Sequence, residues 1–314
     1  MDRKQKEECP EIKIFDIAYN SNYDGPGKRV VIFFQGCNAN CIWCHSPHSQ
    51  LANSPLLFNE SSCKFCRKCE LACANNVHKI IGNKHYINRD NCVSCGSCID
   101  ACPTSFSYLK TGTLIMPTKI INVDDLFEKL QPYLDMIKKN GGITLSGGEA
   151  LLQKRGVKKL LKLCKNKGIN TAVETSGLLP IEYYSNLENL VDYWLFGVRF
   201  TTDYGNNDFS SQINETYKII SKYNSKIILR IPIIPNQTDT DWYLNKCVNF
   251  IKSNEIHEIQ VNPWNMNFFH YYNLTQIKLK YKEPSAQEAD FSKDKLVRYF
   301  YENDIEISNI NNIL

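Results

Sequence analysis

Eleven of the 14 cysteines fall into three short clusters, and this grouping constrains the fold more than any other feature of the chain. The clusters are Cys37, Cys41 and Cys44, then Cys63, Cys66, Cys69 and Cys73, and then Cys92, Cys95, Cys98 and Cys102. Because cytosolic thiols are kept reduced, cysteines this close together in a cytosolic chain indicate metal ligands or redox groups and not disulfides.

The rest of the sequence favours the cytoplasm. The N-terminal segment MDRKQKEECPEIK is charged and lacks the apolar stretch of a targeting signal. The longest apolar runs, VVIFF at 30–34 and KIILRIPIIP at 226–235, are too short to cross a bilayer, so we expect no membrane association. The formal net charge of +4 is spread along 314 residues, which argues against a nucleic-acid partner.

The second and third clusters share the pattern C-x2-C-x2-C-x3-C, which is the spacing of bacterial ferredoxins with two 4Fe-4S clusters. There, three cysteines of each run hold one cluster and the fourth reaches the other. This predicts two ligand sets: Cys63, Cys66, Cys69 and Cys102, and Cys92, Cys95, Cys98 and Cys73. Pro103 follows the second run as this pattern expects, whereas Ala74 follows the first. The alternative, zinc, prefers two C-x2-C pairs separated by a longer segment.

The first cluster has the spacing C-x3-C-x2-C and only three cysteines. A 4Fe-4S cluster held by three thiolates keeps one iron free of protein ligands, and that iron can bind substrate. Downstream, ITLSGGEALLQ at 143–153 contains a short strand followed by two glycines, which let the backbone turn closely past a ligand.

C-x3-C-x2-C followed by GGE resembles the radical S-adenosylmethionine superfamily. The longer stretch YDGPGKRVVIFFQGCNANCIWCHSPHSQ at 23–50 is similar to the glycyl-radical enzyme activating enzymes of that superfamily. The cysteine-rich insert is similar to one branch of them, which includes activators of choline lyase, glycerol dehydratase and arylacetate decarboxylases. VETSG at 173–177 and KIILRIPIIPNQTD at 226–239 resemble further family segments. The resemblance covers roughly residues 12–270.

The resemblance implies three 4Fe-4S clusters and S-adenosylmethionine as cofactors. It assigns the site cluster to Cys37, Cys41 and Cys44, with the methionyl amino and carboxylate groups on the fourth iron. Asp24, in the DGPG segment, becomes a candidate substrate contact. The cofactor-binding residues that the resemblance implies are Trp43, His45, Gly147, Gly148, Glu149, Glu174, Thr175, Arg199 and Asn265.

Four segments of the sequence depart from the family pattern. Gly197 and Arg199 stand where the family has a D-x-K pair, so the acidic contact is missing while an arginine fork can still bind a carboxylate. Glu174 replaces the aspartate before Thr175, and Asn265 replaces a histidine near the ribose. The loop after Pro235 lacks the usual glycine.

Apolar periodicity predicts alternating strands and helices. Strands are expected at 30–34, 143–145, 170–174, 192–200, 227–233 and 258–262, and helices around 127–137, 157–164 and 244–251. This alternation favours a parallel sheet with helices outside and ligands at the C-terminal ends of the strands. The resemblance implies an α/β fold of the radical SAM type. It also implies that residues 1–54 and 111–314 form a partial (β/α)6 barrel, and that residues 55–110 form a ferredoxin-like insert.

The implied reaction needs no catalytic side chain beyond the site cluster. An electron from the cluster cleaves S-adenosylmethionine to methionine and a 5'-deoxyadenosyl radical, which takes a hydrogen atom from a glycine Cα of a partner glycyl-radical enzyme under anaerobic conditions. Ferredoxin or flavodoxin is the expected electron donor. Two other functions stay open: a diverged radical enzyme acting on a small molecule or peptide, and a non-enzymatic electron-transfer protein. The second alternative explains neither the three-cysteine loop nor GGE.

Overall fold

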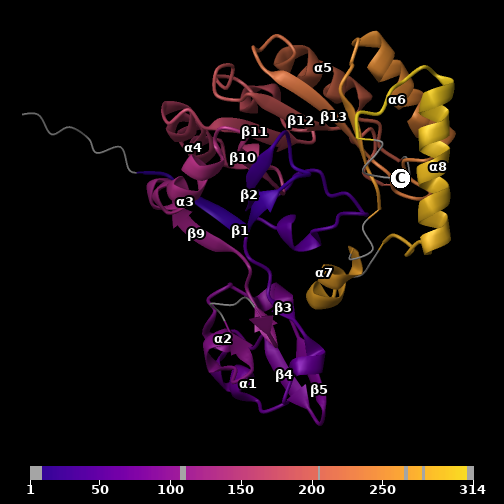
Figure 1. The fold of residues 1–314 in the computed structure, drawn as a ribbon. Helices are drawn as coiled ribbons and strands as arrows, with labels where there is room; N and C mark the ends of the chain where they lie inside the picture. Colours follow the sequence, from indigo (N-terminus) through magenta and orange to yellow (C-terminus); the bar gives the residue numbers. More distant parts are fainter. Residues whose placement is uncertain (1–8, 107–110, 204–205, 265–267, 278–279, 310–314) are drawn as a thin grey trace, which may run out of the picture.

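The structure is a computed structural model, which describes residues 9–106, 111–203, 206–264, 268–277 and 280–309. Its described residues form an eight-stranded sheet in the order β14-β13-β12-β11-β10-β2-β1-β9 (Figure 1). Neighbouring strands from β2 to β14 are parallel, whereas β1 and β9 are antiparallel to their neighbours. The strands are β1 (Glu11–Ser21), β2 (Lys28–Phe34), β9 (Lys119–Asn122), β10 (Gly141–Gly147), β11 (Asn170–Thr175), β12 (Tyr193–Gly197), β13 (Lys226–Pro232) and β14 (Ile259–Asn262).

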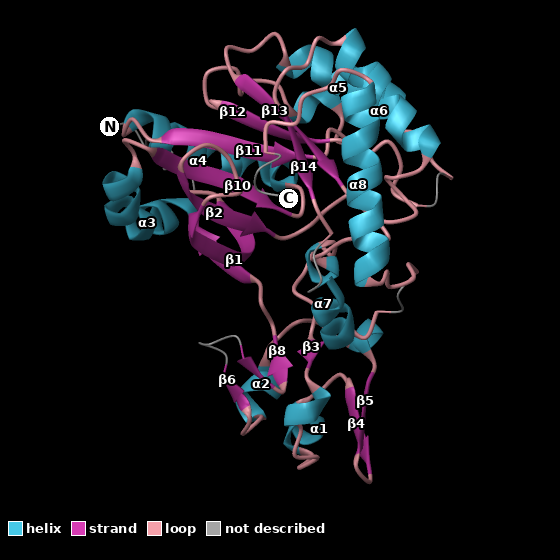
Figure 2. Cartoon of the chain, turned by 45° about the vertical axis from the view of Figure 1, so that its right-hand side comes forward, coloured by secondary structure: helices cyan, strands magenta, loops and turns pink. Residues whose placement is uncertain are grey.

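In the described part of the chain, four helices alternate with the parallel strands and lie on the outer side of the curved sheet (Figure 2): α3 (Val123–Ile137), α4 (Lys154–Asn166), α5 (Ser210–Ile220) and α6 (Asp241–Ser253). Two more follow the last strand: α7 (Phe268–Thr275) lies between the sheet and the cysteine-rich segment, and α8 (Ala286–Glu302) packs against α6. Side-chain caps define several starts: Asn122 Oδ1 accepts from Asp124 N at 2.9 Å before α3, and Ser285 forms a capping box with Glu288 before α8. The expected α/β fold with a parallel sheet is confirmed.

The six parallel strands match the six expected ones, because strands buried on both faces appear in the sequence as continuous apolar runs. The largest error in a strand boundary is at the end of β12. β12 was expected to reach residue 200 but ends at Gly197. The chain after it leaves the sheet to support the cysteine loop, where Ile42 N donates to Thr202 O at 3.0 Å. Arg199 therefore lies just beyond the strand.

The cysteine-rich segment forms a small module beside α7, at the bottom of Figure 1. Its elements are β3 (Leu57–Phe58), α1 (Lys68–Ala72), β4 (His78–Ile81), β5 (Lys84–Ile87), α2 (Ser97–Ala101), β6 (Ser105–Phe106), β7 (Thr111–Gly112) and β8 (Leu114–Ile115). The module has its own apolar core around Phe58, Ile80 and Ile99. Arg89 ties it to the segment after α7, since Nη1 donates to Gln276 Oε1 at 2.9 Å.

The sequence repeat becomes a structural repeat. Each four-cysteine run passes through a left-handed residue, Arg67 (φ 62°) or Gly96 (φ 84°), and then enters a five-residue helix. The fourth cysteine follows each helix as its C-cap. Among the described residues, no helix is both long and apolar enough to cross a membrane.

Candidate cofactor site

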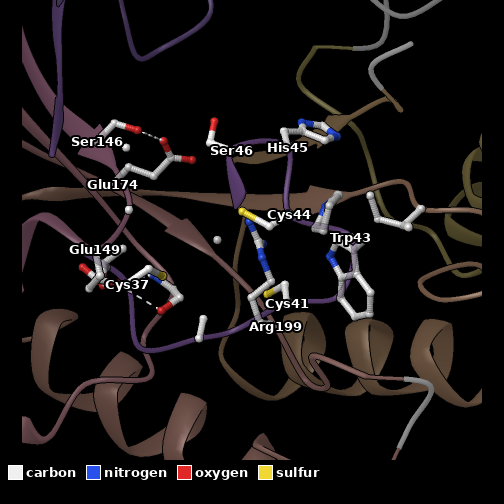
Figure 3. Close-up of a pocket in the computed structure, with 18 residues that line it drawn as sticks. Cys37, Cys41, Trp43, Cys44, His45, Ser46, Ser146, Glu149, Glu174 and Arg199 are labelled. Carbon is white, nitrogen blue, oxygen red and sulfur yellow. Dashed lines mark hydrogen bonds between the residues drawn. The ribbon is translucent and has the colours of Figure 1, made fainter. Parts of the chain in front are cut away.

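An open cavity with about 850 Å³ of empty space lies at the C-terminal ends of β2, β10, β11 and β12 (Figure 3). Side chains from the cysteine loop after β2, from the GGE turn after β10 and from the segment after β12 line it. Eleven residues predicted from the sequence as site residues contribute to this lining: Cys37, Cys41, Trp43, Cys44, His45, Gly147, Gly148, Glu149, Glu174, Thr175 and Arg199. Asp24 is not among the lining residues, and Asn265 lies outside the described residues.

Backbone hydrogen bonds hold the cysteine loop in place. Gly36 N donates to Ser49 O at 2.8 Å, and Cys37 N donates to Gln50 O at 3.3 Å, which closes the loop on itself. The buried side chain of Gln35 reinforces this closure, because its Nε2 donates to His48 O at 2.8 Å. The three thiols are thus directed toward one cavity by a loop whose ends are fixed.

The two glycines of GGE let β10 pass directly against this loop. Gly148 N donates to Phe34 O and Glu149 N donates to Gly36 O, both at 2.8 Å. A Cβ on Gly147, which has φ +106°, would lie 2.4 Å from Phe34 N, and a Cβ on Gly148 would lie 2.1 Å from Gly36 O. Only glycine allows this approach, and the approach puts the Glu149 carboxylate beside the cysteine loop.

Glu149 is 1% exposed, and its two carboxylate oxygens differ in their hydrogen bonds. Oε2 accepts three hydrogen bonds of 3.0 Å, from Thr175 Oγ1, Ser176 N and Ser176 Oγ. Oε1 has no hydrogen-bond partner among the described residues. Burial raises the pKa of Glu149 to about 7, although the bonds from Ser176 and Thr175 oppose the shift. An unpaired buried acceptor is costly, so this oxygen is suited to a cationic ligand in the cavity.

The donor set of the cavity suits an iron-sulfur cluster. Burial is the main cause that raises the pKa of Cys37 and of Cys44 to about 12, so these thiols hold their protons until a metal replaces them. Soft thiolate ligands select clusters of this kind. Figure 3 shows Arg199 extending toward the thiols, and its charge counteracts the rise that burial causes in the pKa of Cys41.

Two aromatic side chains close one side of the cavity. Trp43 is 3% exposed and belongs to an apolar cluster with Ile234, Trp264 and Tyr272. His45 makes an edge contact with Trp264 at 5.6 Å between ring centroids. Burial, together with the positive charge of Arg199, lowers the pKa of His45 to about 4, so the ring is neutral at pH 7.

An arginine that sequence analysis missed connects Glu174 to the DGPG segment. Arg230 on β13 donates from Nη1 to Glu174 Oε1 at 3.1 Å and lies 3.9 Å from Asp24 Oδ1. Glu174 Oε2 also accepts from Ser146 Oγ at 2.5 Å. The available signal in the sequence was the arginine inside the apolar run IILRIP, because a buried charge needs a partner.

The insert brings its eight cysteines together around α1 and α2. Burial is the main cause that raises the pKa of Cys69 to about 11, and the thiols of Cys102 and Cys63 add to it. Burial likewise raises the pKa of Cys98 to about 12, with the thiols of Cys92 and Cys73 among the further causes. The fourth cysteine of each run thus lies close enough to the third cysteine of the other run to raise the pKa of its thiol.

Comparison with known proteins agrees with both parts of the chain. Residues 100–244 match the family model "Radical SAM superfamily", and residues 55–112 match "4Fe-4S dicluster domain". The choline trimethylamine-lyase activating enzyme of Oleidesulfovibrio alaskensis is 32% identical over 248 residues, which cover 76% of this chain and 77% of that enzyme. The chain belongs to the radical SAM activating enzymes. It is a glycyl-radical enzyme activating enzyme, and its residues 55–112 form a dicluster insert.

Other activating enzymes are similar over most of their length. The 4-hydroxyphenylacetate decarboxylase activating enzyme of Clostridioides difficile is 28% identical over 80% of this chain and 81% of its own. The trans-4-hydroxy-L-proline dehydratase activating enzyme of the same species is 28% identical over 92% and 95%. Among solved structures, a domain of a pyruvate-formate lyase-activating enzyme from Bacteroides vulgatus matches 54% of this chain and 98% of its own, with 18% identity and a TM-score of 0.41.

Proposed function

We propose that this activating enzyme installs a glycyl radical on a partner enzyme, by removing a hydrogen atom from a glycine Cα. When bound, the site cluster and S-adenosylmethionine supply the electron and the carbon-centred radical for this reaction. The relatives described above are named as activating enzymes of a lyase, a decarboxylase and a dehydratase. These names support a glycyl-radical enzyme as the partner of this chain. The chain's own residues bind, orient and shield, and none of them has to act as a general base.

The observation that carries this proposal is the unpartnered Glu149 Oε1 in the cavity that the three thiols also line. In our proposal Cys37, Cys41 and Cys44 hold three irons of the site cluster, and Glu149 accepts from the ammonium of S-adenosylmethionine. Gly147 and Gly148 let the ligand approach the backbone. Trp43 and His45 shield the cofactor on the side of the apolar cluster, and Glu174, with Thr175 behind it, lines the opposite wall.

The function is tested with the reduced enzyme, S-adenosylmethionine and a purified glycyl-radical enzyme encoded near it. We expect 5'-deoxyadenosine to form together with a glycyl-radical doublet in the electron paramagnetic resonance spectrum of the partner. Cleavage of the cofactor without that doublet, whichever glycyl-radical enzyme is offered, would instead favour a small molecule or peptide as hydrogen donor.

We further propose three 4Fe-4S clusters in all, two of them in the insert. The ligand sets are Cys63, Cys66, Cys69 and Cys102, and Cys92, Cys95, Cys98 and Cys73. The insert at 55–110 would pass electrons from a ferredoxin or flavodoxin toward the barrel formed by 1–54 and 111–314. The influence of Cys102 on Cys69, and of Cys73 on Cys98, supports this ligand pairing.

Arg199 is proposed to bind the cofactor carboxylate. Arg199→Ala should weaken S-adenosylmethionine binding by about 2 kcal/mol, or roughly thirtyfold, because a charge-assisted pair is lost. Arg199→Lys should recover part of the affinity, since an ammonium has no planar fork. Gly197→Asp should be tolerated, because a Cβ there would lie 3.2 Å from the flexible Arg199 guanidinium.

Calorimetric titration of these variants, with the exposed Arg298→Ala as matched control, measures the affinities. The iron content is determined in parallel. If Arg199→Ala loses iron while its affinity per loaded site stays unchanged, Arg199 serves the Cys41 thiolate and not the cofactor carboxylate.

A further inference from the structure

Two buried histidines face each other inside the insert and have no role in the function proposed above. His78 on β4 is 4% exposed and His85 on β5 is 6% exposed. The two strands form a hairpin in which His85 pairs with Ile80, two residues after His78. Both rings therefore point to the same face of the hairpin, toward the cysteines of α1 and α2.

The rings continue a chain of polar contacts that starts at a cysteine. His85 Nδ1 lies 3.7 Å from Cys63 Sγ, and His85 Nε2 lies 2.9 Å from His78 Nδ1. His85 Nε2 is also 3.8 Å from Cys69 Sγ. Both sulfurs belong to the ligand set completed by Cys66 and Cys102, which we call the first ligand set.

The other end of this series of polar contacts, at His78, lies beside the second ligand set. His78 lines a small hollow together with Cys73, Cys92, Cys95 and Cys98. Its Nε2 is buried and has no hydrogen-bond partner among the described residues. The His78–His85 pair thus lies between the two sets, with an acceptor sulfur at the Cys63 end and none at the other.

The geometry determines where the protons sit. Two neutral imidazoles carry two N–H groups, and one of these must fill the 2.9 Å contact between the rings. If His78 Nδ1–H donates to His85 Nε2, the second proton is on His85 Nδ1 and points at Cys63 Sγ. In the opposite arrangement a lone pair would face the Cys63 thiolate and the His78 Nε2–H would be buried without an acceptor, which is unfavourable on both counts.

We propose that His85 donates a hydrogen bond to Cys63 and thereby raises the reduction potential of the cluster held by the first ligand set, and that His78 fixes the tautomer of His85. Hydrogen bonds to cluster sulfurs are a principal control of such potentials, and the partner behind a donor ring sets its orientation. Because the second set receives no N–H from this pair, two ligand sets of identical spacing acquire different potentials. This inference rests on the ligand pairing proposed above.

The test is a redox titration of the full-length chain, followed by electron paramagnetic resonance. The chain carries Cys37→Ala, Cys41→Ala and Cys44→Ala, so that the signals come from the insert. The solution is held at the midpoint potential that the first cluster has before His85 is changed. At this potential His85→Leu should lower the ratio of reduced to oxidised first cluster about tenfold, which is the effect of losing one hydrogen bond to a charged group. For a one-electron couple, tenfold corresponds to 59 mV. The second cluster should titrate as before.

Three further variants identify the cause. His85→Asn places an amide N–H near the former Nδ1 position and should restore most of the ratio. His78→Leu should shift the same cluster in the same direction by a smaller factor, since only the tautomer is released. The exposed His257→Leu is the matched control and should change neither cluster.

Equal shifts of both clusters, no shift in His85→Leu, or an Asn variant that behaves like Leu would each overturn the proposal. Zinc in the protein as purified, lost in His78→Leu, would also overturn it, because Cys69, His78 and His85 have donor atoms within 4.8 Å of one another. If His85→Leu fails to hold its cluster, the titrations of His85→Asn and His78→Leu decide. An insert with fewer than two clusters before any histidine is changed would contradict the ligand pairing itself, which is a separate failure.

Discussion

Replacing Cys37, Cys41 and Cys44 together with alanine should abolish cleavage of S-adenosylmethionine and remove about a third of the iron. Three clusters of four irons make about twelve irons in the intact chain, as the ligand spacings require. The loop should keep its fold, because its anchors are backbone bonds such as Gly36 N to Ser49 O. Iron analysis after anaerobic reconstitution and chromatography of 5'-deoxyadenosine measure the two effects.

The matched control for this experiment is a variant with two cysteines of the insert replaced. Cys66→Ser and Cys95→Ser alter exposed cysteines that do not line the cavity, so S-adenosylmethionine binding should be unchanged while turnover with a biological electron donor becomes slower. Residual cleavage in the variant of the three-cysteine loop would show that the site cluster is assigned to the wrong cysteines. Undiminished turnover in the insert variant would make the insert a scaffold and not an electron relay.

Much of the fold could be predicted because its signals are local. β2 and β13 are buried on both faces over most of their length, and VVIFF and KIILRIP therefore stand out in the sequence. The helix α5 was missed, because its sequence SSQINETYKII carries polar residues over most of its surface and buries few side chains. β1 was missed as well, since it is held by pairing with both β2 and β9, and β9 is more than 100 residues away in the chain.

The residues of the candidate site likewise fall into those that a local motif predicts and those that depend on long-range contacts. The cysteine spacings and GGE are short motifs, and the structure brings both into one cavity. The contact between Arg230 and Glu174 joins residues 56 positions apart, and no local pattern predicts it. The roles of Ser176 and Thr175 as donors to Glu149 also depend on how β10 and β11 pair. The histidine pair was within reach of sequence analysis, because HKIIGNKHYI at 78–87 has a glycine turn between two short segments that each contain a histidine and isoleucine.

The second large effect is expected at Glu149. Glu149→Gln should weaken S-adenosylmethionine binding roughly thirtyfold, because a charged acceptor for the ammonium becomes a neutral one. In the wild-type enzyme the affinity should fall about tenfold per unit as the pH drops below 7, since the pKa of Glu149 is raised to about 7 and the protonated carboxyl must lose its proton to bind a cation. The variant should bind with little dependence on pH over this range.

Stability measurements separate loss of binding from loss of fold. A carboxyl whose pKa is higher in the folded chain than in the unfolded chain favours folding when protonated, so wild-type stability decreases as the pH rises from 4.5 to about 7. At pH 8 the buried carboxylate costs roughly 3 kcal/mol relative to an unfolded one, at 1.36 kcal/mol per pKa unit. Glu149→Gln removes that cost, and its apoprotein should therefore melt at a higher temperature than the wild type at pH 8 but not at pH 5. The exposed Glu182→Gln, the same chemical change outside the cavity, should alter neither binding nor melting. A Gln variant that is less stable at pH 8, or that binds S-adenosylmethionine as the wild type does, would mean that Glu149 is held by an internal partner and is not kept ionised for the cofactor.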